Sequence, residues 1–451
     1  MRTVKIASGA GFGGDRIEPA LDIIKQDAAD YIMFECLAER TIALAQKKKL
    51  DNPELGYNPL LDYRMKKVIP LLKKHPIKII TNMGAANPVA AAKRIYELAC
   101  ESDMEDLKVA VIIGDNVIES IKRFYDHEIM ENGEKLESLD GKIISANAYI
   151  GGRSISRALA KGADIVVTGR VADPLLCSGP LMYEFGKSYE DYEFLGKTVV
   201  AGHLLECGGQ VTGGYFADPG KKDVPDLWNL GFPIVEFEES GDFTISKLPD
   251  TGGMVTEATV KEQLLYEIQD PANYITPDVI ADFSNLKTEQ IKKDTVKVTG
   301  GSGKAATKTY KVSVGYEDGY IGTGEISYGG RNCLARGNLC IRIIEEHMKE
   351  LADRVLEQRL DMIGVNSLFG NTSAIPTEPA EVRIRLAIRT ENREDAKEAG
   401  REIESLYTNG PAGGGGARSG VSHIIAIASI LMDKTCIQED ILWEGKKDEV
   451  I

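Results

Sequence analysis

The sequence lacks most of the features that mark membrane, secreted and metal-binding proteins. No apolar run approaches the roughly 18 residues that span a bilayer, so we expect no membrane segment. The opening residues, MRTVKIASGAG, lack the charged, apolar and small-residue regions of a secretory signal, so we expect none. The seven cysteines are odd in number and never spaced as CxxC. This predicts reduced thiols in the cytoplasm and argues against a disulfide framework or a structural zinc site.

Positive charge is also scarce. The chain has 54 Lys and Arg against 69 Asp and Glu, for a formal net charge of −15. This balance excludes nucleic acid and anionic membrane surfaces as expected partners. Single basic side chains such as Arg16, Arg153 and Arg170 can still hold a small anion. With only five histidines, candidates for acid–base chemistry near neutral pH are few.

What the sequence does have is a series of six short apolar runs in its first half, each ending in glycine or polar residues before a helix-length stretch. This alternation predicts βαβ units and an α/β domain with a parallel sheet, either Rossmann-like or barrel-like. The carboxyl ends of parallel strands meet at one edge, where ligands bind. We therefore expect one cleft surrounded by Asp15, Arg16, Glu35, Asn82, Asp115, Asn147, Arg170 and Asp173.

The length of 451 residues predicts two domains. Composition changes after a helix that ends near residue 207, so we place an α/β domain at 1–210 and a smaller α+β domain at 211–451. In the second domain we predict one long helix over 331–358 and a helix over 421–432. The tail, about 359–451, is predicted to form a ferredoxin-like module.

A glycine-rich turn follows the first predicted strand. Gly9, Gly11 and Gly14 have the GxGxxG spacing, and Glu35 ends the next strand about twenty residues on, as in a dinucleotide-binding fingerprint. The alternative is a turn that uses glycine only for close packing. Asp15 at the helix entry favours this alternative, because its carboxylate would repel a pyrophosphate.

A second glycine-rich loop spans 410–420 and precedes the predicted helix 421–432. Exposed backbone N–H groups and a helix N-terminus make an anion cradle. The alternative is a flexible lid or close backbone packing. We predict that the loop approaches the cleft and is poorly ordered without ligand. Its candidate binding residues are Gly413, Gly414, Gly415, Gly416 and Arg418.

Several residues have the chemistry of an acid–base centre. His203 and Glu206 are spaced i,i+3 on one helix face, where the carboxylate can orient the ring and the pair can shuttle a proton. The alternative is a satisfied structural contact. Asp173 and Glu35 are further candidate catalytic carboxylates. Glu35, with a second carboxylate four residues later, can also hold a divalent cation, and Arg170 is predicted to fix a substrate carboxylate or thioester oxygen.

Taken together, several segments resemble the acyclic terpene utilisation (AtuA) family, in collinear order from about residue 3 to about residue 432. They are GAGFGGDR (9–16), FECLAERTIALAQ (34–46), TNMGAANP (81–88), GADIVVTGRVADP (162–174), TVVAGHLLECGGQVTGG (198–214), TGGMVTEATVKEQLLYEIQDPANYITPDV (251–279), GYEDGYIGTGEISYGG (315–330) and GPAGGGGARSG (410–420).

The resemblance implies a catabolic setting with acyl-CoA intermediates. We therefore expect a cytoplasmic enzyme, homo-oligomeric, that acts on an acyl-CoA thioester or a branched or unsaturated carboxylic acid. The expected reaction is that of a lyase, either hydration and dehydration or an aldol-type cleavage. The sequence makes no cofactor certain, and it leaves two candidates open: a CoA moiety as part of the substrate and a divalent cation. Two alternatives remain: an NAD(P)-dependent oxidoreductase and a non-catalytic subunit that binds acyl-CoA.

Overall fold

The computed structural model describes residues 2–370 and 379–445. The chain divides into two compact units, one made of Met1–Gly315 and Ile427–Ile451 and the other of Tyr316–Ala426. This division differs from the predicted boundary near residue 210. The change to strand-rich sequence after that residue does not start a new domain, because those strands extend the sheet of the first unit.

The first unit is built on a ten-stranded sheet. Its strands are β1 (Thr3–Ala10), β2 (Tyr31–Phe34), β3 (Lys78–Thr81), β4 (Val109–Ile113), β6 (Ile165–Thr168), β7 (Pro233–Glu238), β8 (Phe243–Lys247), β11 (Lys287–Lys292), β12 (Thr295–Thr299) and β18 (Asp440–Glu444). Their order is β11-β12-β8-β7-β1-β2-β3-β6-β4-β18. The run from β1 to β4 is parallel, and the flanking strands pair antiparallel. The predicted α/β class is confirmed, and the sheet is open and mixed.

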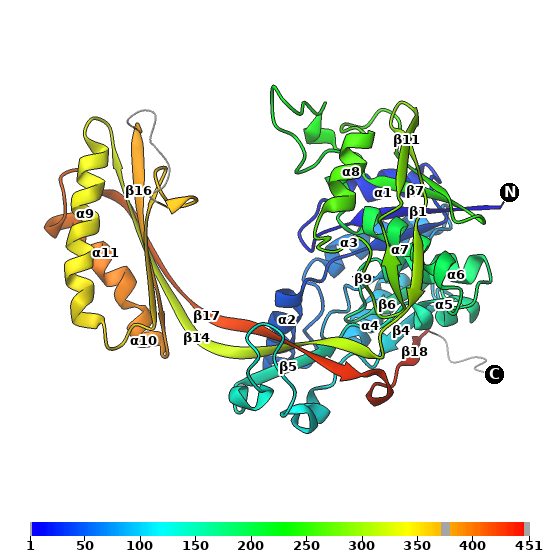
Figure 1. Ribbon diagram of the computed structural model, residues 1–451, viewed down its shortest axis with the longest axis horizontal. Coiled ribbons are helices and arrows are strands. Elements are labelled where there is room, and N and C mark those ends of the chain that lie inside the picture. Colours follow the sequence, from blue (N-terminus) through cyan, green and yellow to red (C-terminus); the bar gives the residue numbers. More distant parts are fainter. Residues whose placement is uncertain (1, 371–378, 446–451) are drawn as a thin grey trace. The chain divides into compact units, whose positions relative to one another are not determined.

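Helices cover both faces of the parallel strands. On one face, α1 (Glu18–Lys25), α3 (Leu61–Leu72) and α4 (Pro88–Cys100) share an apolar core with alternate strand residues such as Ile32 and Phe34. On the other face, helices α5 to α7 pack side by side (Figure 1). Tyr31, which alternates with Ile32 along β2, donates its hydroxyl to Glu184 there at 2.5 Å. The bounds of these helices are α5 (Arg153–Ala160), α6 (Leu175–Glu184) and α7 (Tyr192–Glu206).

One of the six predicted strands leaves the parallel sheet. This strand, β5 (Ile143–Ala148), pairs with β14 (Thr309–Gly329) instead. Its end still reaches β4, because the Ala148 amide donates to the Asp115 carbonyl at 2.7 Å. The remaining elements of this unit are α2 (Glu39–Asp51), α8 (Glu257–Leu265) and a small sheet of β9 (Tyr274–Ile275), β10 (Val279–Asp282) and β13 (Ser302–Ala305).

The second unit has its own core and a sheet in the order β15-β16-β14-β17. Along the chain its elements run strand, helix, strand, strand, helix, strand, which is the split βαβ order. They occupy Tyr316–Ala426, so the predicted module at 359–451 has different ends. After β14 they are α9 (Cys333–Met348), β15 (Glu357–Ile363), β16 (Glu381–Thr390), α10 (Arg393–Ala396), α11 (Glu398–Asn409) and β17 (Gly415–Asp433).

One helix prediction in the carboxyl-terminal half is wrong, and a second is correct in its first part but extends too far. The segment 421–432 belongs to strand β17, which pairs beside β14. It is rich in isoleucine, and a β-branched apolar run fits a paired strand as well as a helix, so tertiary pairing decides. The predicted helix 331–358 ends at Met348, and residues 357–363 form β15. Within the described residues, no helix is long and apolar enough to cross a membrane.

Candidate functional site

A cavity of about 300 Å³ lies in the first unit, at the carboxyl ends of β5 and β6. Its wall is formed by the residues that follow these two strands, by the start of α2, by the loop around β9 and by the start of β14. This is the sheet edge at which open α/β proteins bind ligands. The lining residues are Glu39, Tyr149, Ala172, Asp173, Pro174, Glu267, Tyr274, Ile275, Thr276, Pro277, Thr309, Tyr310 and Lys311.

Glu39 is the centre of a polar cluster on this wall. Its Oε1 accepts a hydrogen bond from the Tyr149 hydroxyl at 2.8 Å and another from the Lys311 ammonium at 2.7 Å. Burial acts to raise the pKa of Glu39, but these two donors outweigh it and hold the pKa below its ordinary value. Burial raises the pKa of Tyr149. The cluster therefore contains an ionised carboxylate and a neutral phenol at neutral pH.

Arg170 fixes the second carboxylate of the wall, Asp173. The Arg170 side chain is fully buried and donates to the Leu37 and Val171 carbonyls and to the Asp173 carboxylate. Its guanidinium also lies 4.5 Å from the centre of the Tyr149 ring. Asp173 keeps about a third of its side chain exposed, at 35%. Arg170 thus acts on the cavity through Asp173, and its own N–H groups point to protein partners.

Behind this wall lies a network of buried polar groups. The Asp115 carboxylate accepts from the Arg170 amide at 2.9 Å and from Asn147 Nδ2 at 2.8 Å, and burial raises its pKa. Asn147 Oδ1 in turn accepts from Gln46 at 3.2 Å. Glycine is required at position 169, because a Cβ there would lie 2.6 Å from Asp115 Oδ2. The network fixes the β6 turn that presents Asp173.

Glu35 and Asn82 form a second buried pair at the ends of β2 and β3. Asn82 Nδ2 donates to Glu35 Oε1 at 2.9 Å, and Asn82 Oδ1 accepts from the Cys36 amide at 2.7 Å. The same Glu35 oxygen accepts from the Leu37 amide at 2.8 Å. Burial raises the pKa of Glu35, with the nearby carboxylate of Glu206 adding to the effect. These contacts shape the chain that leads from β2 to Glu39.

His203 and Glu206 are in contact, as their spacing predicts. His203 Nδ1 lies 2.7 Å from Glu206 Oε1, and His203 Nε2 lies 2.9 Å from the Gln263 carbonyl oxygen. A carbonyl oxygen only accepts, so Nε2 carries a proton and donates it there. Both ring nitrogens are thus bonded to protein groups, and the ring packs against Tyr274 and Phe283. The pair lies behind Tyr274 and does not line the cavity.

The glycine-rich turn after β1 is closely packed. A Cβ at Gly11 would lie 2.1 Å from the Gly208 nitrogen, and a Cβ at Gly9 would lie 2.7 Å from the Phe34 ring. The Gly11 amide donates to the Asp15 carboxylate at 2.8 Å. That carboxylate occupies an N–H that a phosphate would use, so these contacts favour the packing interpretation of the glycines over dinucleotide binding.

The N-terminus of α5 is likewise occupied by a carboxylate of the chain. The Gly152 amide donates to Asp278 Oδ2 at 2.7 Å, and a Cβ at Gly151 would lie 2.1 Å from Asp278 Oδ1. Asp278 follows Pro277, which lines the cavity. A carboxylate of the chain therefore takes the place where an anionic ligand would meet this helix N-terminus.

Two predicted arginines do not line the cavity. Arg16 is exposed, donates to the Trp228 carbonyl at 2.8 Å and pairs with Glu18. Arg153 is exposed, pairs with Glu190 at 3.2 Å and lies over the Tyr189 ring. Sequence position at the first turn of a helix does not determine where a long side chain points.

The predicted anion cradle belongs to the second unit. The cradle of Gly413, Gly414, Gly415, Gly416 and Arg418 lacks the predicted helix N-terminus, because residues from Gly415 onward are in β17. Gly414 instead packs against Ile326 and Tyr328. The predicted anion cradle is therefore not supported by an adjoining helix, and Arg418 is exposed on the strand.

The sequence interpretation missed most of the wall. Tyr149 comes two residues after Asn147, at the end of a predicted strand. Its position after a strand is therefore a signal by which it could have been found. Four further side chains of the wall come from segments assigned to another domain: Glu267, Tyr274, Tyr310 and Lys311. Glu267 and Tyr274 lie in the segment 251–279 that carries the family resemblance, but nothing in it singles them out, and no motif marks Tyr310 or Lys311.

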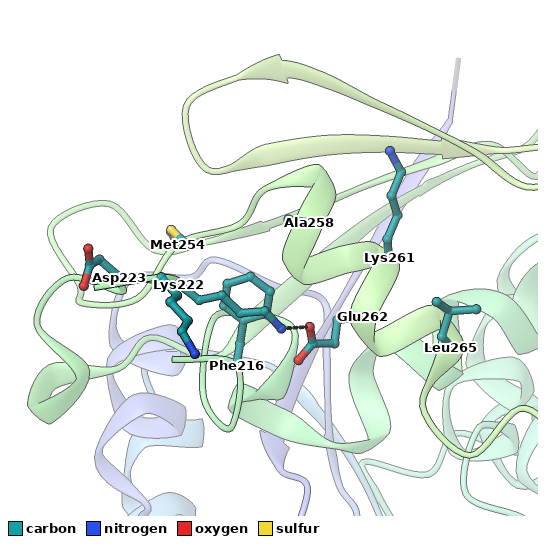
Figure 2. A pocket seen from close by; sticks show the side chains of 9 residues that line it. Phe216, Lys222, Asp223, Met254, Ala258, Lys261, Glu262 and Leu265 are labelled. Carbon is teal, nitrogen blue, oxygen red and sulfur yellow. Dashed lines mark hydrogen bonds and ion pairs between the residues drawn. The ribbon is translucent and has the colours of Figure 1, made fainter. Parts of the chain in front are cut away.

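A second, more open hollow of about 580 Å³ lies beside α8 (Figure 2). Its floor is apolar, with Phe216, Met254 and Leu265. Its charged side chains pair with acidic neighbours: Lys222 bonds to Glu262, and Lys261 bonds to Glu257 at 2.6 Å. It lacks the converging polar groups of the strand-end cavity, which we take as the candidate site.

No group of three or more His, Cys, Asp and Glu side chains is placed to hold a metal ion in residues 2–370 and 379–445. A family model described as "Acyclic terpene utilisation family protein AtuA" matches residues 4–443. No curated protein and no solved structure matches the chain.

Proposed function

Because the chain belongs to the acyclic terpene utilisation family AtuA, we propose that it acts in the catabolism of acyclic terpenes as a lyase. The substrate class we propose is an acyl-CoA thioester or a related branched or unsaturated acid, and the reaction is addition or removal of water. The observation that carries this proposal is the cavity wall, where three carboxylates face the same space as phenol and ammonium donors.

Water elimination needs a base for a proton on carbon and a donor for the leaving oxygen. We assign the base to Asp173, which Arg170 holds in place. We assign the donor to Lys311, which Glu39 and Tyr149 position. In the dehydration direction, Asp173 takes the proton from carbon, the C–O bond breaks, and Lys311 supplies a proton to the departing hydroxyl as water forms. Hydration is the reverse.

Asp173 replaces the predicted acid–base centre of His203 and Glu206 in this proposal, because both nitrogens of His203 are bonded to protein groups. An aldol-type cleavage needs the same base and the same oxygen donor, so product analysis distinguishes the two lyase reactions.

The test is turnover of branched enoyl and hydroxyacyl thioesters by the purified protein. We predict that Asp173→Asn lowers kcat by about 10²–10⁴ and also lowers the melting temperature, because it removes the ion-pair partner of the buried Arg170; kcat is therefore measured at a temperature at which the variant is folded. Glu190→Gln, at an exposed ion pair away from the cavity, is the matched control and keeps its turnover.

Failure of the wild-type protein to convert any of these substrates would contradict the lyase. Binding of an acyl-CoA without turnover would then support the subunit alternative, and saturable binding of NAD(P)H would support the oxidoreductase.

A further inference from the structure

The wall of the strand-end cavity is negatively charged. It carries three carboxylates, Glu39, Asp173 and Glu267, against the ammonium of Lys311 and the buried guanidinium of Arg170, and this leaves one net negative charge. Arg170 lies behind the wall and is bonded to Asp173. In a space of about 300 Å³, partly shielded from water, like charges interact more strongly than in bulk solvent.

The one cation of the wall is already committed. The Lys311 ammonium donates to Glu39 Oε1 at 2.7 Å and lies 5.7 Å from the centre of the Tyr149 ring. A carboxylate ligand that accepted from another N–H of this ammonium would lie beside the Glu39 carboxylate and face Asp173 and Glu267, which carry the same charge. A hydroxyl or carbonyl oxygen can accept from the ammonium without that repulsion.

The remaining polar groups of the wall are phenols. Burial raises the pKa of Tyr149, Tyr274 and Tyr310, so all three are neutral at physiological pH. Tyr149 donates its proton to Glu39 and Tyr310 donates to Glu439 at 3.5 Å, so Tyr274 is the phenol of this wall that can donate to a ligand oxygen. Two of these rings already lie beside cations, since Arg170 is near Tyr149 and the Lys434 ammonium is 5.1 Å from the centre of the Tyr310 ring. The apolar part of the wall includes Ile275 and Pro174.

From this wall we infer that the cavity takes the uncharged, branched end of an acyclic isoprenoid, as an alcohol or a thioester, and rejects the corresponding free carboxylate. The inference rests on the proposed function for the choice of an isoprenoid and narrows its substrate class by excluding the free acid. It concerns binding, so it is tested apart from turnover.

The experiment is calorimetric titration of the full-length protein with three unreactive ligands of the same carbon skeleton: a saturated methyl-branched alcohol, the S-ethyl thioester of the corresponding acid, and the carboxylate of that acid. We expect the alcohol or the thioester to bind at least about tenfold more tightly than the carboxylate at low salt. The preference should narrow as salt screens the wall. The uncharged ligand that binds more tightly shows whether the natural ligand is an alcohol or a thioester.

Charge variants link this preference to the wall. Glu267→Gln removes one negative charge and is expected to narrow the preference several-fold by improving carboxylate binding. Glu262→Gln, on the same chain segment but in the open hollow beside α8, is the matched control and leaves the preference unchanged.

Equal or tighter binding of the carboxylate by the wild-type protein overturns the inference, and so does failure of all three ligands to bind. Tight binding of an uncharged ligand together with no turnover of reactive substrates would leave the inference standing and refute the lyase.

Discussion

Carboxylates at the strand ends of the first unit differ in whether their surroundings stabilise or destabilise the charged form. Glu39 is stabilised as an anion by two donors, whereas Asp115 and Glu35 are buried deeply enough that desolvation dominates and raises their pKa values. A group with a raised pKa binds more protons in the folded protein than in the unfolded chain. Its contribution to stability is therefore complete below the unfolded pKa and is lost as pH rises through the folded pKa.

Asp115 gives a direct test of this effect. Asp115→Asn removes the titration and keeps an oxygen that can accept from Arg170 and Asn147. We predict that the variant gains stability relative to wild type as pH rises from about 4, by up to about 1.4 kcal/mol per pH unit, until the folded pKa is passed. Urea unfolding over a pH series measures this.

Asp126→Asn, at an exposed pair with Lys135, is the control and should show no comparable trend. A difference between Asp115→Asn and wild type that stays constant with pH would contradict the assignment of Asp115 as a buried group with a raised pKa.

For single residues, the position after a predicted strand identifies the members of the buried network but does not show where their side chains point. Asp115, Arg170 and Asp173 follow strands of the parallel sheet and share hydrogen bonds because those strand ends meet at one edge. Asn147 joins them from β5, which lies outside that sheet. Sequence position cannot show that the His203 ring is bonded to a carbonyl sixty residues away along the chain. It also cannot give side-chain direction, so Arg16 and Arg153 were included although they lie outside the cavity.

At the scale of elements, strand β14 shows how closely a helix can approach a sheet. Gly322 and Gly324 alternate along the strand, so they face the same side. A Cβ at Gly322 would lie 1.7 Å from the Ala396 carbonyl oxygen, and one at Gly324 would lie 2.4 Å from the Ala399 carbonyl oxygen. Helices α10 and α11 can therefore pack directly on the backbone of this strand only because both positions lack a side chain.

We predict that Gly322→Ala destabilises the protein by at least about 3 kcal/mol, because the obstructing atom is backbone and cannot move aside as a side chain does. Gly329→Ala is the matched control on the same strand: nothing lies within 4 Å of its added Cβ, and we expect a change within about 0.5 kcal/mol. Urea unfolding of both variants measures the difference. Equal effects of the two substitutions would contradict this packing.

The type of each element was predictable where helices and strands alternate regularly. The prediction failed where an apolar run fits either a helix or a strand. Segment 421–432 has an isoleucine-rich pattern that suits either element, and only its pairing within the sheet makes it a strand. Of the antiparallel strands that extend the sheet of the first unit, residues 234–238, 243–247 and 296–299 are predictable as strands, whereas 287–292 is not. Sequence did not show that they extend the parallel sheet, because register and partner are set by contacts distant in sequence.

At the scale of the whole molecule, the two units have separate apolar cores. Ile80 of β3 and Ile384 of β16 are fully buried, each in its own unit. Separate cores allow separate cooperative unfolding, so a single stability value need not describe the chain.

We predict that Ile384→Ala, at a cost of about 2–5 kcal/mol, lowers hydrogen-exchange protection within 316–426 and leaves the protection of the first unit unchanged. Ile80→Ala is the reciprocal control and should lower protection in the first unit alone. Loss of protection throughout the chain in either variant would show that the two units unfold as one.

The carboxylates of Asp15 and Asp278 have a consequence for selectivity. Each is tethered to the chain and occupies backbone N–H groups at a turn or helix start where a parallel-sheet protein commonly receives an anion. A tethered group acts at an effective concentration in the millimolar range or above. Free phosphates and nucleotides must therefore compete with a carboxylate of the chain at these two positions. Ligand recognition is left to groups that bind uncharged oxygen atoms. The two carboxylates thus act within the chain as competitors of the phosphate and nucleotide anions that are abundant in metabolism.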